Sequence, residues 1–197
     1  MGLDMYLNKM PRYKDTTADD VAMVEDYLDW EAAKKEGSTH ANCSFKQWCG
    51  RDVDFNSNKV NDLIDFYSPF YQKKYADWDT EKKYGYAHIM DQVGYWRKAN
   101  QIHNWFVENV QDGEDECRYY REVTQEDLEE LLDICHDVLT NPDLAPQLLP
   151  TQGGFFFGST MYDEYYMEDI KNTINIIAQV LETTDFDKEM LYYRASW

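Results

Sequence analysis

The segment from Thr124 to Thr140 carries the most regular row of chemically active groups in the chain. It contains six carboxylates and no Lys or Arg. Four of these stand at positions i, i+4, i+7 and i+11, namely Glu126, Glu130, Asp133 and Asp137. On an α-helix they would form one stripe with neighbouring side chains about 5 to 6 Å apart. Like charges at this spacing destabilise a helix by a few tenths of a kcal/mol, so the pattern indicates a function that compensates for the loss.

A second acidic cluster lies just upstream, in the sequence DGEDE. Its carboxylates belong to Asp112, Glu114, Asp115 and Glu116. A row of carboxylates is comparable with the phosphates along one nucleic-acid strand, so it could occupy a protein groove built for DNA or RNA. Two alternatives stay open: a solvated face that keeps the protein soluble, and binding of a divalent cation through oxygen ligands. The spacing of an EF-hand loop is absent, and no metal site is predicted.

The composition supports a folded acidic protein. There are 38 Asp and Glu against 19 Lys and Arg, a formal net charge of -19, and 16% of the residues are aromatic. Disordered acidic tails lack aromatic residues, so a compact domain is expected. The charge opposes direct binding to nucleic acid or to an anionic membrane surface. It favours a basic protein surface as the partner.

A different kind of chemistry is concentrated between Val93 and Val110, a segment whose apolar spacing predicts one amphipathic helix. On such a helix Trp96, Asn100 and His103 would share a face, offering an aromatic plate, an amide and a titratable imidazole. Arg97 could add a contact to an anion. Thr151 and Asp163, from a later segment, could complete the pocket of a small-molecule-binding protein or hydrolase. The alternative is a hydrogen-bonded structural histidine beside the core.

Several familiar sites are absent or incomplete. The outline Gly153-x4-Gly158-Ser159-Thr160 resembles a phosphate loop, but its lysine is missing and three Phe residues fill the loop, so no nucleotide site is predicted. His40, Cys43 and Cys49 have a wider spacing than usual zinc ligands and no clear fourth ligand. The four cysteines are expected to be free thiols, and no cofactor is predicted.

The elements that must position these groups can be read from periodicity. Leu3, Met5 and Leu7 alternate with polar residues, which predicts a strand that ends at Pro11. A helix is predicted from Thr16 or Thr17 to about Glu36, with Gly37 as its stop. A helical turn follows around residues 45–49, and a further helix from near Ser57 to before Pro69. Residues 70–86 show no clear period.

The second half continues the alternation of helices and strands. After the predicted helix at 93–110, Thr124 opens a helix with Asp127 at the capping-box position and Asn141-Pro142 as its end. The run GGFFFGS predicts a buried strand. A helix from Tyr162 to Leu181 and a strand at MLYYRASW follow. The fold class predicted is helix-rich α+β, with about four to five helices packed on a small, mostly antiparallel sheet.

Length and hydropathy bound the organisation. A chain of 197 residues fits a single globular domain over residues 1–197. No apolar run approaches the 18 or so residues that a membrane span needs, and no secretion signal is visible, so a cytoplasmic location is expected. The sequence leaves the oligomeric state open.

Three blocks resemble a widespread family of small bacteriophage and prophage proteins of unassigned function. They are MGLDMYL at 1–7, VGYWRKANQIHNWFVENVQDG at 93–113 and LLPTQGGFFFGSTMYDEYYMEDI at 148–170, with the C-terminal Ser-Trp as a fourth similarity. Residues 9–86 lie outside the resemblance. It implies a viral protein in a bacterial cytoplasm and brings no established chemistry. Together with the acidic stripe, it favours a non-enzymatic inhibitor, for instance of host defence, that binds a host nucleic-acid-binding protein.

Overall fold

The computed structural model describes residues 2–76, 89–115, 117 and 120–197. Its contacts divide the chain into two compact units. One, the sheet unit, consists of Met1–Arg12 and Gln92–Trp197; the other, the helical unit, is Tyr13–Asp91. The candidate site residues named above all belong to the sheet unit.

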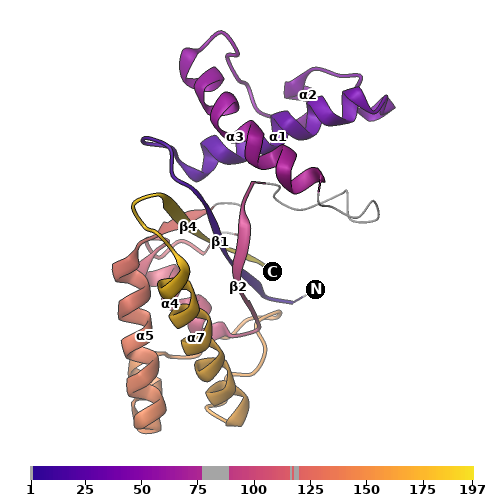
Figure 1. The fold of residues 1–197 in the computed structure, drawn as a ribbon. Helices are drawn as coiled ribbons and strands as arrows, with labels where there is room; N and C mark the ends of the chain where they lie inside the picture. Colours follow the sequence, from indigo (N-terminus) through magenta and orange to yellow (C-terminus); the bar gives the residue numbers. More distant parts are fainter. Residues whose placement is uncertain (1, 77–88, 116, 118–119) are drawn as a thin grey trace. The chain divides into compact units, whose positions relative to one another are not determined.

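The sheet unit is built on four strands in the order β2-β1-β4-β3 (Figure 1). They are β1 (Asp4–Pro11), β2 (Asp91–Arg97), β3 (Arg121–Val123) and β4 (Glu189–Ser196). β1 runs antiparallel to β4, with Asp4 opposite Ser196, and β3 is also antiparallel to β4. As predicted, Leu3, Met5 and Leu7 point into the core and are fully buried.

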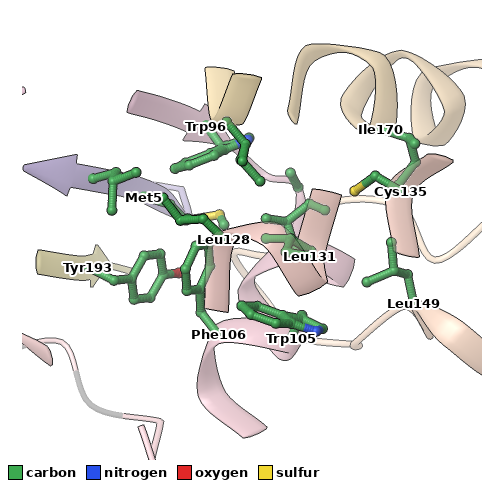
Figure 2. Packing of buried hydrophobic residues seen from close by; sticks show 14 of the residues in the cluster. Met5, Trp96, Trp105, Phe106, Leu128, Leu131, Cys135, Leu149, Ile170 and Tyr193 are labelled. Carbon is green, nitrogen blue, oxygen red and sulfur yellow. The ribbon is translucent and has the colours of Figure 1, made fainter. Parts of the chain in front are cut away.

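The helices of this unit cover one face of the sheet. They are α4 (Asn100–Asn109), α5 (Gln125–Thr140), the short η3 (Pro142–Leu144) and α6 (Ala145–Leu148), and α7 (Glu164–Thr183). α5 and α7 lie side by side. Figure 2 shows how side chains from these helices meet those of the strands, with Trp96, Phe106, Leu131 and Tyr193 among them. Phe106 and Tyr193 stack with ring centroids 4.0 Å apart.

The helical unit contains the remaining elements. They are α1 (Ala18–Lys35), η1 (Thr39–Ala41), α2 (Phe45–Cys49) and α3 (Asn58–Ala76). α1 begins with a capping box between Thr17 and Asp20 and ends before Gly37, which has a left-handed backbone at φ +74°. The predicted start and stop of this helix are confirmed. The helix-rich α+β class is confirmed as well, although the described residues form seven α-helices, more than predicted.

The predicted single helix at 93–110 is wrong. Residues 91–97 form β2, and α4 begins only at Asn100. Gly94 and Trp96 are buried whereas Tyr95 and Arg97 are exposed, which is the period of a strand. Lys98, at φ +61°, then breaks the chain direction. A Cβ on Gly94 would stand 2.9 Å from Ile176, so glycine lets α7 approach the strand closely.

Two further predictions are corrected. The run GGFFFGS is a loop and not a strand, because Phe157 N–H bonds back to the Gly154 carbonyl in a turn and Gly158 has φ +93°. α3 does not end before Pro69 but continues to Ala76. Tyr71, which follows the proline, is buried, and its burial favours the helix beyond Pro69. Residues 77–86 lie outside the described part of the chain.

Candidate functional site

The four predicted carboxylates form an exposed row along α5, called here the acidic ridge: Glu126, Glu130, Asp133 and Asp137. All four are exposed. At 100° per residue, they lie within a narrow sector of the helix. The fully buried Leu128, Leu131 and Cys135 lie on the opposite side. The side that anchors the helix in the core therefore fixes the direction in which the carboxylates point.

Local hydrogen bonds fix the start of this helix. The Thr124 hydroxyl accepts from the Asp127 N–H at 3.1 Å, and the Asp127 carboxylate accepts from the Thr124 N–H at 2.8 Å. This is the predicted capping box. Asp127 thus serves the helix end, while Glu129 accepts from Gln125 at 2.7 Å. The ridge carboxylates are separate from both arrangements.

The acidic ridge has no cationic partner within the part of the chain that the structure describes: none of its four carboxylates forms an ion pair there. The helical unit shows the opposite pattern. Several of its carboxylates pair with nearby cations, as in Asp20–Lys59, Asp26–Arg51, Asp52–Lys46 and Asp62–Lys14, at 2.5 to 3.2 Å. The ridge thus carries uncompensated negative charge.

The loop cluster upstream of α5 does not behave as one surface. Asp112 and Glu114 are exposed, and Glu116 lies outside the described residues. Asp115 is half-buried, and its Oδ1 accepts from His103 Nε2 and from Trp197 Nε1, each at 3.0 Å. The side chain of this carboxylate is 24% exposed and its Oδ1 serves two donors of the protein, so it is largely withdrawn from the predicted partner surface.

His103 is the centre of a buried hydrogen-bonded chain. It has no exposed surface, and its Nδ1 lies 2.7 Å from the Tyr193 hydroxyl. An ionised carboxylate only accepts, so we assign the proton to Nε2, which donates to Asp115, while the neutral ring accepts from Tyr193 at Nδ1. Burial lowers the pKa of His103, and the charge of Asp115 opposes that shift. Phe157 packs edge-on against the ring at 5.3 Å.

The residues of the predicted pocket do not share a face. Trp96 is 2% exposed, and its Nε1 donates to Thr173 Oγ1 at 2.9 Å. Arg97 follows it on a strand, so it points to the other face, where it stands 3.9 Å from Asp4. Asn100 and His103 belong to α4 and are both buried. The helix face predicted to carry Trp96, Asn100 and His103 is wrong, because Trp96 lies on β2 whereas Asn100 and His103 lie on α4.

The two later residues of that pocket have structural bonds of their own. Thr151 Oγ1 donates to the Thr160 carbonyl at 3.1 Å. Asp163 caps α7, where its carboxylate accepts from the N–H groups of Tyr165 at 3.0 Å and Tyr166 at 3.2 Å. This use of the positive helix end accounts for the carboxylate. None of these contacts gives His103 access to a substrate.

Sequence reasoning missed two features of the sheet unit. One is Tyr193 as the partner of His103, since periodicity places Tyr193 inward but does not pair it with a residue of α4. The other is the exposure of the loop between α6 and α7, where Phe155 is 96% exposed. The glycines at 153, 154 and 158 signalled this loop, but the apolar run between them favoured a buried strand.

Cys43 and Cys49 donate to the backbone carbonyls of His40 and Phe45. No group of three His, Cys, Asp or Glu that could hold a metal ion occurs among the described residues. No helix in the described ranges is long and apolar enough to cross a membrane. Comparison of the chain with models of known protein families, with curated proteins and with solved structures finds no match.

Proposed function

We propose that this chain is a non-enzymatic, phage-encoded interaction protein whose acidic ridge occupies the basic groove of a bacterial nucleic-acid-binding protein. The observation that carries the proposal is the ridge itself: four exposed carboxylates on one side of α5, with no ion pair to a described cation. The proposed site of action is the host cytoplasm, and interference with a defence protein is the form of inhibition that we favour.

The spacing of the ridge supports mimicry of a nucleic-acid strand. From Glu126 to Asp137 the helix rises about 16 Å, so one carboxylate follows another about every 5 to 6 Å. The charges along one DNA strand follow every 3.4 Å or so of helix axis. The ridge thus reproduces the sign and linear order of the phosphates at a lower density. The net charge of -19 adds long-range attraction to a basic groove.

The buried environment of His103 supports a binding protein over a hydrolase. A general base must reach the proton that it abstracts, directly or through one water molecule. His103 is fully buried, and both of its ring nitrogens already have protein partners. No other observation favours the small-molecule pocket.

The test compares two variants of equal charge. In the ridge variant, Glu126, Glu130, Asp133 and Asp137 are changed to Lys. In the control variant, four exposed acids elsewhere in the sheet unit are changed to Lys: Glu108, Asp143, Glu182 and Asp187. Four reversals of two charges each take the net charge from -19 to -11 in both. Any difference between them then reports the arrangement and not the total charge.

The probe is the fraction of bacterial proteins that bind DNA-cellulose, passed over each immobilised variant. We expect the wild type and the control variant to retain proteins that a short DNA duplex releases, and the ridge variant to retain less than about a tenth as much, because buried or desolvated charge pairs are each worth one to several kcal/mol. Equal retention by the ridge and control variants at low salt would contradict the proposal.

A further inference from the structure

The loop between α6 and α7 and the first turn of α7 expose an unusual set of apolar side chains. Phe155 is 96% exposed, Tyr165 68%, Met161 66% and Tyr162 44%. These are four of the six exposed large hydrophobic side chains in the part of the chain that the structure describes. Isolated exposed apolar residues are normal, but four within residues 155–165 are a local concentration of the kind that marks an interaction site. We call these four residues the aromatic patch.

The three consecutive Phe residues show how the loop is held. Phe157 is buried, with its ring 5.3 Å from His103 and 6.0 Å from Trp197. The carbonyl of the half-buried Phe156 accepts from Leu3 N–H at 3.0 Å. Phe155 precedes these anchors and points away from the core. The loop is therefore fixed directly beside its most exposed residue.

The buried carboxamide of Asn100 clamps the loop from below. Its Nδ2 donates to the carbonyls of Phe157 at 3.1 Å and Ser159 at 2.8 Å, and its Oδ1 accepts from the Gln152 N–H at 2.8 Å. One 1%-exposed side chain thus satisfies backbone groups on both sides of Phe155. A loop held in this way loses little conformational entropy when a partner covers it.

The charge around the aromatic patch indicates which kind of partner covers it. Residues 150–170 contain four acids, Asp163, Glu164, Glu168 and Asp169. They outnumber the two nearby cations, which are Lys171 and Lys98, whose side chain packs beside Gly158. A second copy of this chain, a nucleic acid and an anionic membrane would each bring further negative charge to the patch. A protein surface with an apolar pocket edged by Lys or Arg complements both features. Aromatic side chains are the residues that most often dominate such interfaces.

The position of the patch links it to the acidic ridge. η3 and α6 follow directly after α5 and contact it, so the loop starts at the end of α5 where Asp137 lies. The Tyr166 hydroxyl donates to the Leu149 carbonyl at 3.0 Å and ties the start of α7 to the same end. We propose that the aromatic patch, with Phe155 as its most exposed residue, is the apolar anchor for the basic protein whose groove the ridge occupies. This inference rests on the proposed function and adds an apolar pocket to the partner.

The first experiment identifies what covers the patch. The photo-cross-linker p-benzoylphenylalanine replaces Phe155 in the full chain, expressed in bacterial cells, and a matched chain carries it at Gln179, an exposed position on α7. We expect position 155 to cross-link one host protein and position 179 not to. Cross-links to a second copy of the chain, to lipid or to nucleic acid, equal labelling from both positions, or no cross-link at all would overturn the proposal.

The second experiment measures affinity for the cross-linked protein after purification. The Phe155→Ser variant removes only an exposed side chain and should fold normally. We expect it to bind at least about 30-fold more weakly than the wild type at both low and high salt, as for a hot-spot residue. Binding within twofold of the wild type would overturn the anchor.

Salt dependence keeps the two proposals separate. The ridge variant should lose affinity mainly at low salt and show a shallower dependence of affinity on salt. A normal salt dependence in the ridge variant would reject the groove hypothesis and leave the result for Phe155 to be judged by itself. If the ridge variant shows the shallower salt dependence but Phe155→Ser binds like the wild type, the anchor is rejected and the groove hypothesis stands.

Discussion

The acidic ridge on α5 and the acidic loop before it are both rich in carboxylates, but those carboxylates lie in different environments. In the loop, Asp115 turns inward and binds His103 and Trp197. On α5, Glu130 and Asp133 point outward and have no ion pair among the described residues. The number of acids in a segment therefore does not reveal how many carboxylates a partner can reach. The elements on either side decide it, since α4 places a donor under the loop and the buried side of α5 turns the ridge toward solvent.

Removing one carboxylate from each region should show the difference directly. We expect Asp115→Ala to lower the free energy of unfolding by about 2 kcal/mol, because it leaves the buried His103 N–H without an acceptor. Asp133→Ala should change it by less than about 0.5 kcal/mol, as for exposed positions without special contacts. Urea denaturation measures both. Equal losses would mean that the ridge carboxylates also have structural partners and would remove the contrast.

The buried hydrogen bonds of His103 also predict how the stability of the protein depends on pH. The pKa of His103 is lowered by burial, so between about pH 6.5 and that lower value the unfolded chain binds more protons than the folded one. Stability from this residue is therefore present above about pH 6.5 and is lost as pH falls through that window. Protonation would also make Nδ1 a donor, so the Tyr193 hydroxyl could no longer donate to it. The loss of stability at low pH should be smaller than the loss caused by Asp115→Ala, because the charge of Asp115 stabilises the protonated imidazole.

An NMR titration of the His103 ring checks this prediction, with the signal assigned from its absence in a His103→Asn variant. We expect the ring to stay neutral below about pH 6.5, the value of an unperturbed imidazole. In Asp115→Asn, which keeps an acceptor but removes the charge, the transition should move to still lower pH. A ring that becomes protonated above pH 6.5 would show that the carboxylate and not burial controls it.

The elements with strong local signals could be predicted from the sequence. Thr124 and Asp127 identified the start of α5, Thr17 that of α1, and the alternation of Leu3, Met5 and Leu7 the strand β1. In each case residues within one turn or one strand contain the whole signal. The outward direction of the ridge carboxylates could be predicted as well, because the same 16 residues contain both the apolar and the acidic positions of α5.

The predictions that were wrong all concern residues whose structure depends on contacts with residues distant in the sequence. Residues 93–97 fit a helical spacing, yet they form a strand because β1 is available to pair with them and Gly94 admits α7. The three Phe residues at 155–157 predict a buried strand, yet contacts with Asn100, Leu3 and His103 determine the structure of this segment. The alternative pocket depended on the first of these errors, the helix predicted at 93–110. Local pattern could not show that Trp96 and Arg97 lie on opposite faces.

The smallest expected effect concerns the ridge itself. Glu130 stands four residues from Glu126 and three from Asp133, so Glu130→Gln removes two like-charge contacts. We expect the free energy of unfolding to rise by about half a kcal/mol at low salt. The gain should vanish near 1 M salt, where the screening length is about 3 Å. In the helical unit, Lys59→Gln breaks the Lys59–Asp20 pair and should change stability in the opposite direction, by a similarly small amount. Urea denaturation of both variants at the two salt concentrations measures all four values. A loss of stability in Glu130→Gln would show that the ridge carboxylates are compensated within the protein. The ridge would then carry no unpaired charge for a basic groove to bind.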